Sequence, residues 1–306
     1  MTNQTATRKF TDRTEPQAAF QNAYLDLASR MPGSNNSQIL TYYGMGGIGK
    51  STLLEKLADN LKTQRAFTEK NNGKPLFVSL NFEVCQEDIQ VLTRLRNILS
   101  DSYGWQFPLF ELGLYLYGRS IGEDIDLPET KTVAGQQAPL VRFAIDMASE
   151  LPVVGPFLKI FSLVDQGQAA LRTLLNQHKD LVQQFEKYSP TQQREALPGL
   201  FAADLNAYTE KVKAPLVLFL DTYECIEERA ATQGSAMRRD YWLHGDSRLI
   251  AETKNALWVI AGRNQIQWSV AGCPMEQHLL GSLSDEDACS FLIGAGLPED
   301  LIPHIY

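Results

Sequence analysis

Short apolar runs alternate with amphipathic stretches along this chain. Runs rich in β-branched and aromatic residues predict buried strands, and these runs are 38–43, 74–80, 214–220 and 256–261. Apolar residues spaced three or four apart predict helices with one apolar face, over 17–27, 53–61 and 87–100 and again from Pro190. This alternation indicates an α/β fold, in which a parallel sheet lies between two helical layers.

The segment from about 104 to 188 departs from this alternation. It has few strand signals, and its Leu-, Ala- and Gln-rich periodicity predicts several helices. Its most apolar part, 151–164, is interrupted by two prolines and Lys159. We interpret this part as a buried helical hairpin, with a membrane or partner surface as the alternative. No stretch of the sequence approaches the length of a membrane span.

Composition and charge are those of an ordinary globular protein. Apolar residues make up 44% and charged residues 21% of the 306 positions. The formal net charge of −8 argues against broad contact with a nucleic-acid backbone, because such contact needs a surface rich in Lys and Arg. The N-terminus lacks the apolar core of a signal peptide, and the four cysteines are widely spaced. We therefore expect reduced thiols and a cytoplasmic location.

A glycine-rich loop follows the first predicted strand. It fits the phosphate-binding pattern G-x-x-x-x-G-K-[ST] at every fixed position, and its sequence is Gly44-Met45-Gly46-Gly47-Ile48-Gly49-Lys50-Ser51-Thr52. Glycines let backbone N–H groups surround phosphate oxygens, and the helix that follows presents its positive N-terminus to them. We expect Lys50 to contact the β- and γ-phosphates and the Ser51 hydroxyl to coordinate Mg²⁺. The alternative, a glycine-rich turn without a ligand, has no need of Lys-Ser in the first helical turn.

Two carboxylates follow the most apolar predicted strand. Asp221 ends the run, and Glu224 comes three residues later. Mg²⁺ in nucleotide sites keeps several waters and needs only one or two carboxylates beside the phosphates. We expect Asp221 to hold Mg²⁺ or a water bound to it, and Glu224 to orient or deprotonate the attacking water. An ordinary strand end with a surface carboxylate is the alternative.

Three further residues are candidates for nucleotide contact. Arg263 follows the strand 256–261, and ligands of parallel α/β sheets bind at the carboxyl ends of strands, so we expect it to sense the γ-phosphate. A solvated loop arginine is the alternative. Phe10 and Arg13 precede the first predicted helix. Phe10 is placed to pack against an adenine, and Arg13 to hydrogen-bond to the base or to a neighbouring element.

Five motifs, in this order, together resemble those of the STAND NTPases, the signalling ATPases that include the NB-ARC and NACHT groups. They are the segment before the first helix (10–15), the phosphate loop (44–52), the acidic strand (218–224), the strand that ends in arginine (259–263) and the start of a helical domain (283–288). The resemblance implies a P-loop NTPase of the ASCE type with a three-layer αβα parallel sheet.

The same resemblance implies a division of the chain. An N-terminal arm and helix occupy 1–37, the nucleotide-binding domain occupies 38–283 with a helical insertion at about 104–188, and a small helical domain starts at 284–306, where the chain stops. The Gly-Xaa-Pro-Leu motif of that helical domain is absent. No second aspartate adjoins Asp221, which indicates inefficient hydrolysis.

The function implied by the resemblance is a Mg²⁺-dependent switch that binds ATP and ADP. ADP holds a closed state, exchange for ATP favours an open state that forms homo-oligomers, and slow hydrolysis resets the switch. A region beyond Tyr306 would sense the target, with an output in defence or regulation. One alternative is an AAA-like turnover ATPase or loader that acts on nucleic acid or protein. Another is a small-molecule or nucleoside kinase, which Arg263 and the long insertion fit less well.

Overall fold

Five parallel strands form one sheet in the computed structural model. The strands are β1 (Gln38–Tyr43), β2 (Leu76–Asn81), β3 (Leu216–Asp221), β4 (Ala256–Gly262) and β5 (Met275–Leu279). Their order across the sheet is β2-β3-β4-β1-β5, and every pairing is parallel. The first four strands confirm the four predicted from apolar runs. The fifth was not predicted, because its sequence Met-Glu-Gln-His-Leu is largely polar.

The structure describes residues 13–29, 37–63, 75–84, 87–122, 185, 187–212, 214–227, 239–282, 288–289 and 292–293. The chain divides into two compact units, Met1–Ser102 with Asn206–Tyr306, and Tyr103–Leu205. Its described helices are α1 (Thr14–Ser29), α2 (Lys50–Thr63), α4 (Asp88–Tyr103), α5 (Pro108–Ile121), α10 (Pro190–Val212), α12 (Tyr241–His244) and α13 (Leu249–Glu252). Among these helices none is long and apolar enough to cross a membrane. The predicted hairpin at 151–164 and the helix start at 283–288 fall mainly outside the described residues.

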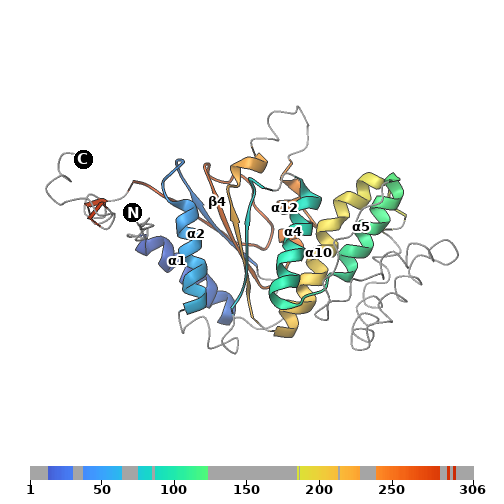
Figure 1. Cartoon of the computed structure of the whole chain (residues 1–306), viewed down its shortest axis with the longest axis horizontal. Helices are drawn as coiled ribbons and strands as arrows, with labels where there is room; N and C mark the ends of the chain where they lie inside the picture. The colour runs from blue at the N-terminus through green and yellow to red at the C-terminus, as the bar shows by residue number, and fades with distance from the viewer. Residues whose placement is uncertain are drawn as a thin grey trace, which may run out of the picture. The chain divides into compact units, whose positions relative to one another are not determined.

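In the first unit, helices cover both faces of the sheet. Figure 1 shows α1 and α2 on one side of the strands and α4 on the other, so the unit has three layers. The predicted α/β class is therefore confirmed. Helix α2 buries the apolar face that its sequence predicts, formed by Leu53, Leu54, Leu57, Ala58 and Leu61.

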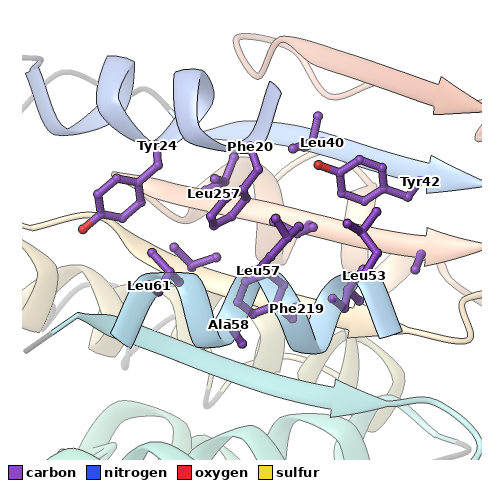
Figure 2. Close-up of a cluster of buried hydrophobic side chains, with 14 of the residues drawn as sticks. Phe20, Tyr24, Leu40, Tyr42, Leu53, Leu57, Ala58, Leu61, Phe219 and Leu257 are labelled. Carbon is purple, nitrogen blue, oxygen red and sulfur yellow. The ribbon is translucent and has the colours of Figure 1, made fainter. Parts of the chain in front are cut away.

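The core of this unit lies between α1, α2 and the sheet. Alternate residues of each central strand point to this side, as the two-residue period of a strand requires. Figure 2 shows Phe20 and Tyr24 of α1 directed toward the side chains of α2 across these strand residues. The strand residues in the cluster are Leu40, Tyr42, Val217, Phe219, Leu257, Val259 and Ala261. This packing fixes the start of α2, and with it the end of the glycine-rich loop.

The predicted start of a helix at Pro190 is also confirmed, because α10 begins there. Ser189 and Gln192 form a reciprocal cap: the Gln192 backbone N–H donates to the Ser189 hydroxyl at 3.4 Å, and the Ser189 N–H donates to the Gln192 side chain at 3.0 Å. Helix α5 packs closely on α10 within the second unit. A Cβ on Gly113 would lie 2.3 Å from Leu200 Cδ1, so a larger residue there would require the Leu200 side chain to shift.

A buried carboxyl group of α10 caps the first turn of α5. The backbone N–H groups of Leu109 and Phe110 donate to Asp204 at 3.3 and 2.9 Å. Helix α5 needs an acceptor from elsewhere, because its N-cap residue, Phe107, makes no side-chain cap hydrogen bond. Burial raises the pKa of Asp204 well above 3.8; the two backbone hydrogen bonds oppose this shift, and the charge of Glu111 adds to it.

This pKa shift predicts how stability depends on pH. The folded state holds the Asp204 proton more tightly than the unfolded state, so the contribution is complete below pH 3.8 and is lost as pH rises toward the folded pKa. The wild-type free energy of unfolding should therefore fall, relative to Asp204→Asn, by up to about 1.4 kcal/mol per pH unit above that point.

Urea denaturation between pH 4 and 7, followed by circular dichroism, measures this difference. Asp101→Asn, at an exposed position of α4, serves as the matched control. A wild-type chain that gains stability over Asp204→Asn as pH rises would show that Asp204 is ionised in the fold.

Candidate functional site

The glycine-rich loop between β1 and α2 is open on its outer side. Gly44, Gly47 and Gly49 have φ angles of 153°, 79° and 94°, a region that residues with a Cβ rarely adopt. A Cβ on Gly46, Gly47 or Gly49 would meet no atom within 4 Å. Gly47 and Gly49 are therefore required by the backbone conformation and not by crowding. The space above the loop is available to a ligand.

Lys50, the first residue of α2, folds back over this loop. Its side chain is buried, and its Nζ donates to the carbonyl oxygens of Gly44 at 2.8 Å and Met45 at 2.9 Å. Burial lowers the pKa of Lys50 from 10.5, whereas the charges of Glu224 and Asp221 raise it and that of Arg263 lowers it again. The hydrogen bonds of the ammonium go to neutral carbonyls, and an anion in hydrogen-bond reach would be a stronger partner than these carbonyls.

The end of β4 holds the two neighbouring loops in place. The Gly44 N–H donates to the Gly262 carbonyl at 3.3 Å, and the Tyr223 N–H donates to the Ala261 carbonyl at 2.9 Å. In the register of the sheet, Tyr43 is paired with Gly262. The root of the glycine-rich loop and the turn after β3 are thus fixed on either side of the last residues of β4.

The turn after β3 is strained. The side chain of Asp221 accepts a hydrogen bond from the Thr222 N–H at 2.8 Å, and Thr222 has a φ of 60°. For a β-branched residue this conformation is an outlier that costs about 1–3 kcal/mol, and such strain clusters at functional sites. It allows the chain to turn sharply, so that Asp221 and Glu224 both remain at the carboxyl end of the sheet.

Glu224 and Arg263 form an ion pair at this end of the sheet. Arg263 Nε lies 3.1 Å from Glu224 Oε1. Glu224 is only 7% exposed, and its other oxygen, Oε2, is buried without a hydrogen-bond partner among the described residues. An unpaired buried carboxylate oxygen is costly, and its position indicates a missing donor such as water or a ligand.

The charges of Asp221, Glu224 and Arg263 act on Lys50, so these side chains lie near the start of α2. Ser51 is exposed in the first turn of α2, and Thr52 is half-buried beside it. Arg13 contacts the loop from another side, because its Nη2 donates to the Ile48 carbonyl at 3.2 Å and to the Gly281 carbonyl at 2.8 Å. Phe10 lies outside the described residues.

A buried polar group behind the site was not predicted. The Tyr223 hydroxyl donates to Asp240 and accepts from Trp268 Nε1 at 2.8 Å. The His244 ring stacks on Trp268, with ring centroids 4.4 Å apart. These residues come from three segments of the chain, because Asp240 and His244 lie together at α12, and they match no motif. The one available signal was the position of Tyr223 between the two candidate carboxylates. The group anchors the turn that carries Glu224.

A metal ion here would need ligands beyond the protein. In the part of the chain that the structure describes, no cluster of three or more His, Cys, Asp or Glu side chains could hold a metal ion. The oxygens of Ser51 and Asp221 suit Mg²⁺, which is commonly bound through one or two protein ligands together with phosphate and water. The residues present thus fit a cation that arrives with a phosphate ligand better than a dedicated metal site.

Comparison with known proteins adds no assignment. No protein-family model matches the chain, and searches of the curated proteins and of the solved structures found no match.

Proposed function

We propose that the chain binds ATP and ADP, with Mg²⁺, at the loop Gly44–Ser51. The observation that carries this proposal is the combination of an open glycine-rich loop and a buried Lys50 ammonium held by the carbonyls of that same loop. A phosphate group in the open space would accept from backbone N–H groups and would offer Lys50 a charged partner in place of neutral carbonyls. The N-terminus of α2 adds its partial positive charge at the same point.

The order of the strands also supports a nucleotide site at this loop. The loops after β1 and β4 run toward opposite edges of the sheet, because β1 is followed in the chain by β2 at one edge and β4 by β5 at the other. In open parallel sheets, ligands bind outside the carboxyl ends of strands at such points. This order is compatible with the ASCE type of P-loop NTPase that the sequence motifs resemble.

Within this proposal, each charged residue has a role. Mg²⁺, when bound, supplies charge neutralisation between the phosphates, and Ser51 and Asp221 are the protein groups that would hold it. Glu224 has a buried oxygen with no hydrogen-bond partner among the described residues, so it can accept a proton or orient a water beside the phosphates. The Arg263 side chain is more than half exposed, so it can move from its ion pair with Glu224 to a phosphate.

We further propose that this site belongs to a STAND-type signalling switch with slow hydrolysis, in which nucleotide exchange drives conformational change and homo-oligomerisation. The five motifs in STAND order support the switch, and the lack of a second aspartate beside Asp221 supports slow hydrolysis. The runner-up is an AAA-like turnover ATPase or loader, because the same sheet and carboxylates also serve rapid hydrolysis.

The loop assignment is tested by Lys50→Ala. Loss of the charged donor should weaken the binding of Mg²⁺-ADP by about 100-fold or more, measured by calorimetry on the full chain. Lys56→Ala is the matched control, because Lys56 lies exposed on the same helix and should bind as the wild type does. Unchanged ADP affinity in Lys50→Ala, with a thermal transition like that of the wild type, would refute the assignment.

Steady-state hydrolysis separates the two functions. For a switch we expect fewer than about one ATP hydrolysed per second, at the low end of the range for enzymes. Glu224→Gln should lower that rate further while leaving ADP binding in place, because in this proposal the carboxylate acts on the attacking water and not on the phosphates of ADP. Many turnovers per second, stimulated by nucleic acid or by a protein substrate, would instead favour the loader.

A further inference from the structure

Three contacts join the glycine-rich loop to the chain that leaves β5. The Leu280 N–H donates to the Tyr43 carbonyl at 2.7 Å. A Cβ on Gly44 would lie 2.6 Å from the Leu280 carbonyl oxygen, so the first glycine of the loop permits a close backbone approach. Arg13 Nη2 then bridges the carbonyls of Ile48 and Gly281. The loop and the segment 280–282, which we call the β5 exit, are therefore in direct contact.

Arg13 is held where it is at a cost. Its φ is 72°, a left-handed conformation that a residue with a long side chain seldom adopts. Helix α1, which follows Arg13, is fixed to β1 and to α2. The Tyr42 hydroxyl of β1 donates to the Pro16 carbonyl at 2.7 Å, and the Asn60 side chain of α2 donates to the Gln17 side chain at 3.2 Å. This anchoring over-determines the strained residue, as expected where strain serves a function.

We propose that Arg13 couples the phosphate loop to the β5 exit, so that nucleotide binding is transmitted to the chain that follows Gly281. This proposal rests on the proposed nucleotide site. The same nitrogen atom, Arg13 Nη2, donates both hydrogen bonds. A movement of the Ile48 carbonyl when phosphate binds must therefore move the guanidinium or break one of these hydrogen bonds. Arg13 acts here as a positioning residue on backbone carbonyls, which is the second of the two roles expected from sequence, a hydrogen bond to a neighbouring element.

Hydrogen exchange on the full chain, with and without Mg²⁺-ADP, tests the coupling. In the wild type, ADP should slow exchange both in 44–51 and in the β5 exit. In Arg13→Gln and Arg13→Gly, saturating ADP should still protect 44–51, but the response of the β5 exit should disappear. Without nucleotide, the Leu280 amide should exchange about tenfold faster or more in both variants, as for a lost hydrogen bond to a charged group.

The two variants separate coupling from simple stability. Glycine relieves the strain at φ 72°, whereas glutamine keeps it, so their effects on the melting temperature should differ while their loss of coupling is the same. Arg119→Gln, at an exposed position of α5, is the matched control and should respond as the wild type does.

Failure of the coupling can be distinguished from failure of the nucleotide site. A β5 exit that responds to ADP in both Arg13 variants as it does in the wild type would overturn the coupling and leave the nucleotide site intact. No protection of 44–51 by ADP in the wild type would overturn the nucleotide site, and the coupling with it.

Discussion

The pairing of β4 between β1 and β3 is the constraint on which the candidate site depends. Its last two carbonyls, those of Ala261 and Gly262, accept hydrogen bonds from the turn after β3 and from the root of the glycine-rich loop. Backbone hydrogen bonds at the end of a buried strand tolerate little displacement. Lys50 and the two carboxylates therefore meet at the carboxyl end of the sheet, although they lie far apart in the sequence. Arg263 follows directly and is carried to the same place.

Around this frame, the site contains several features that are unfavourable by themselves. Thr222 and Arg13 have positive φ angles, the Lys50 ammonium is buried against neutral carbonyls, and the Glu224 Oε2 atom is buried without a partner among the described residues. Each of these costs free energy in the chain alone. Their concentration around the carboxyl end of the sheet is the physical reason to regard this end as a ligand site, since a phosphate, a cation and water would supply the missing partners.

Much of the fold could be predicted from the sequence. The apolar runs of β1 and β3 and the helical spacing of α2 identify their elements because burial on both faces or on one face leaves a clear pattern. The strand β5 could not be predicted, since an edge strand with side chains such as Glu276 and His278 is only partly buried and needs little apolar character.

The candidate site was predictable where a motif fixes chemistry and spacing together. This holds for Lys50 in its loop and for Asp221 at the end of an apolar strand. It does not hold for Tyr223 and Asp240, because a buried hydrogen bond between distant segments depends on tertiary structure alone. The contact of Arg13 with Gly281 is of the same kind: sequence marked the residue, but its backbone partner follows from the position of β5.

Binding of phosphate at the loop Gly44–Ser51 can be followed at the amide groups of its glycines. The chain would be labelled with ¹⁵N-glycine at its 21 glycines and titrated with Mg²⁺-ADP in an NMR experiment. If phosphate binds there, the amide resonances of Gly46, Gly47 and Gly49 should shift most, because their N–H groups gain a phosphate acceptor. Saturable shifts confined to glycines outside 44–49, or no shift at millimolar ADP, would contradict it.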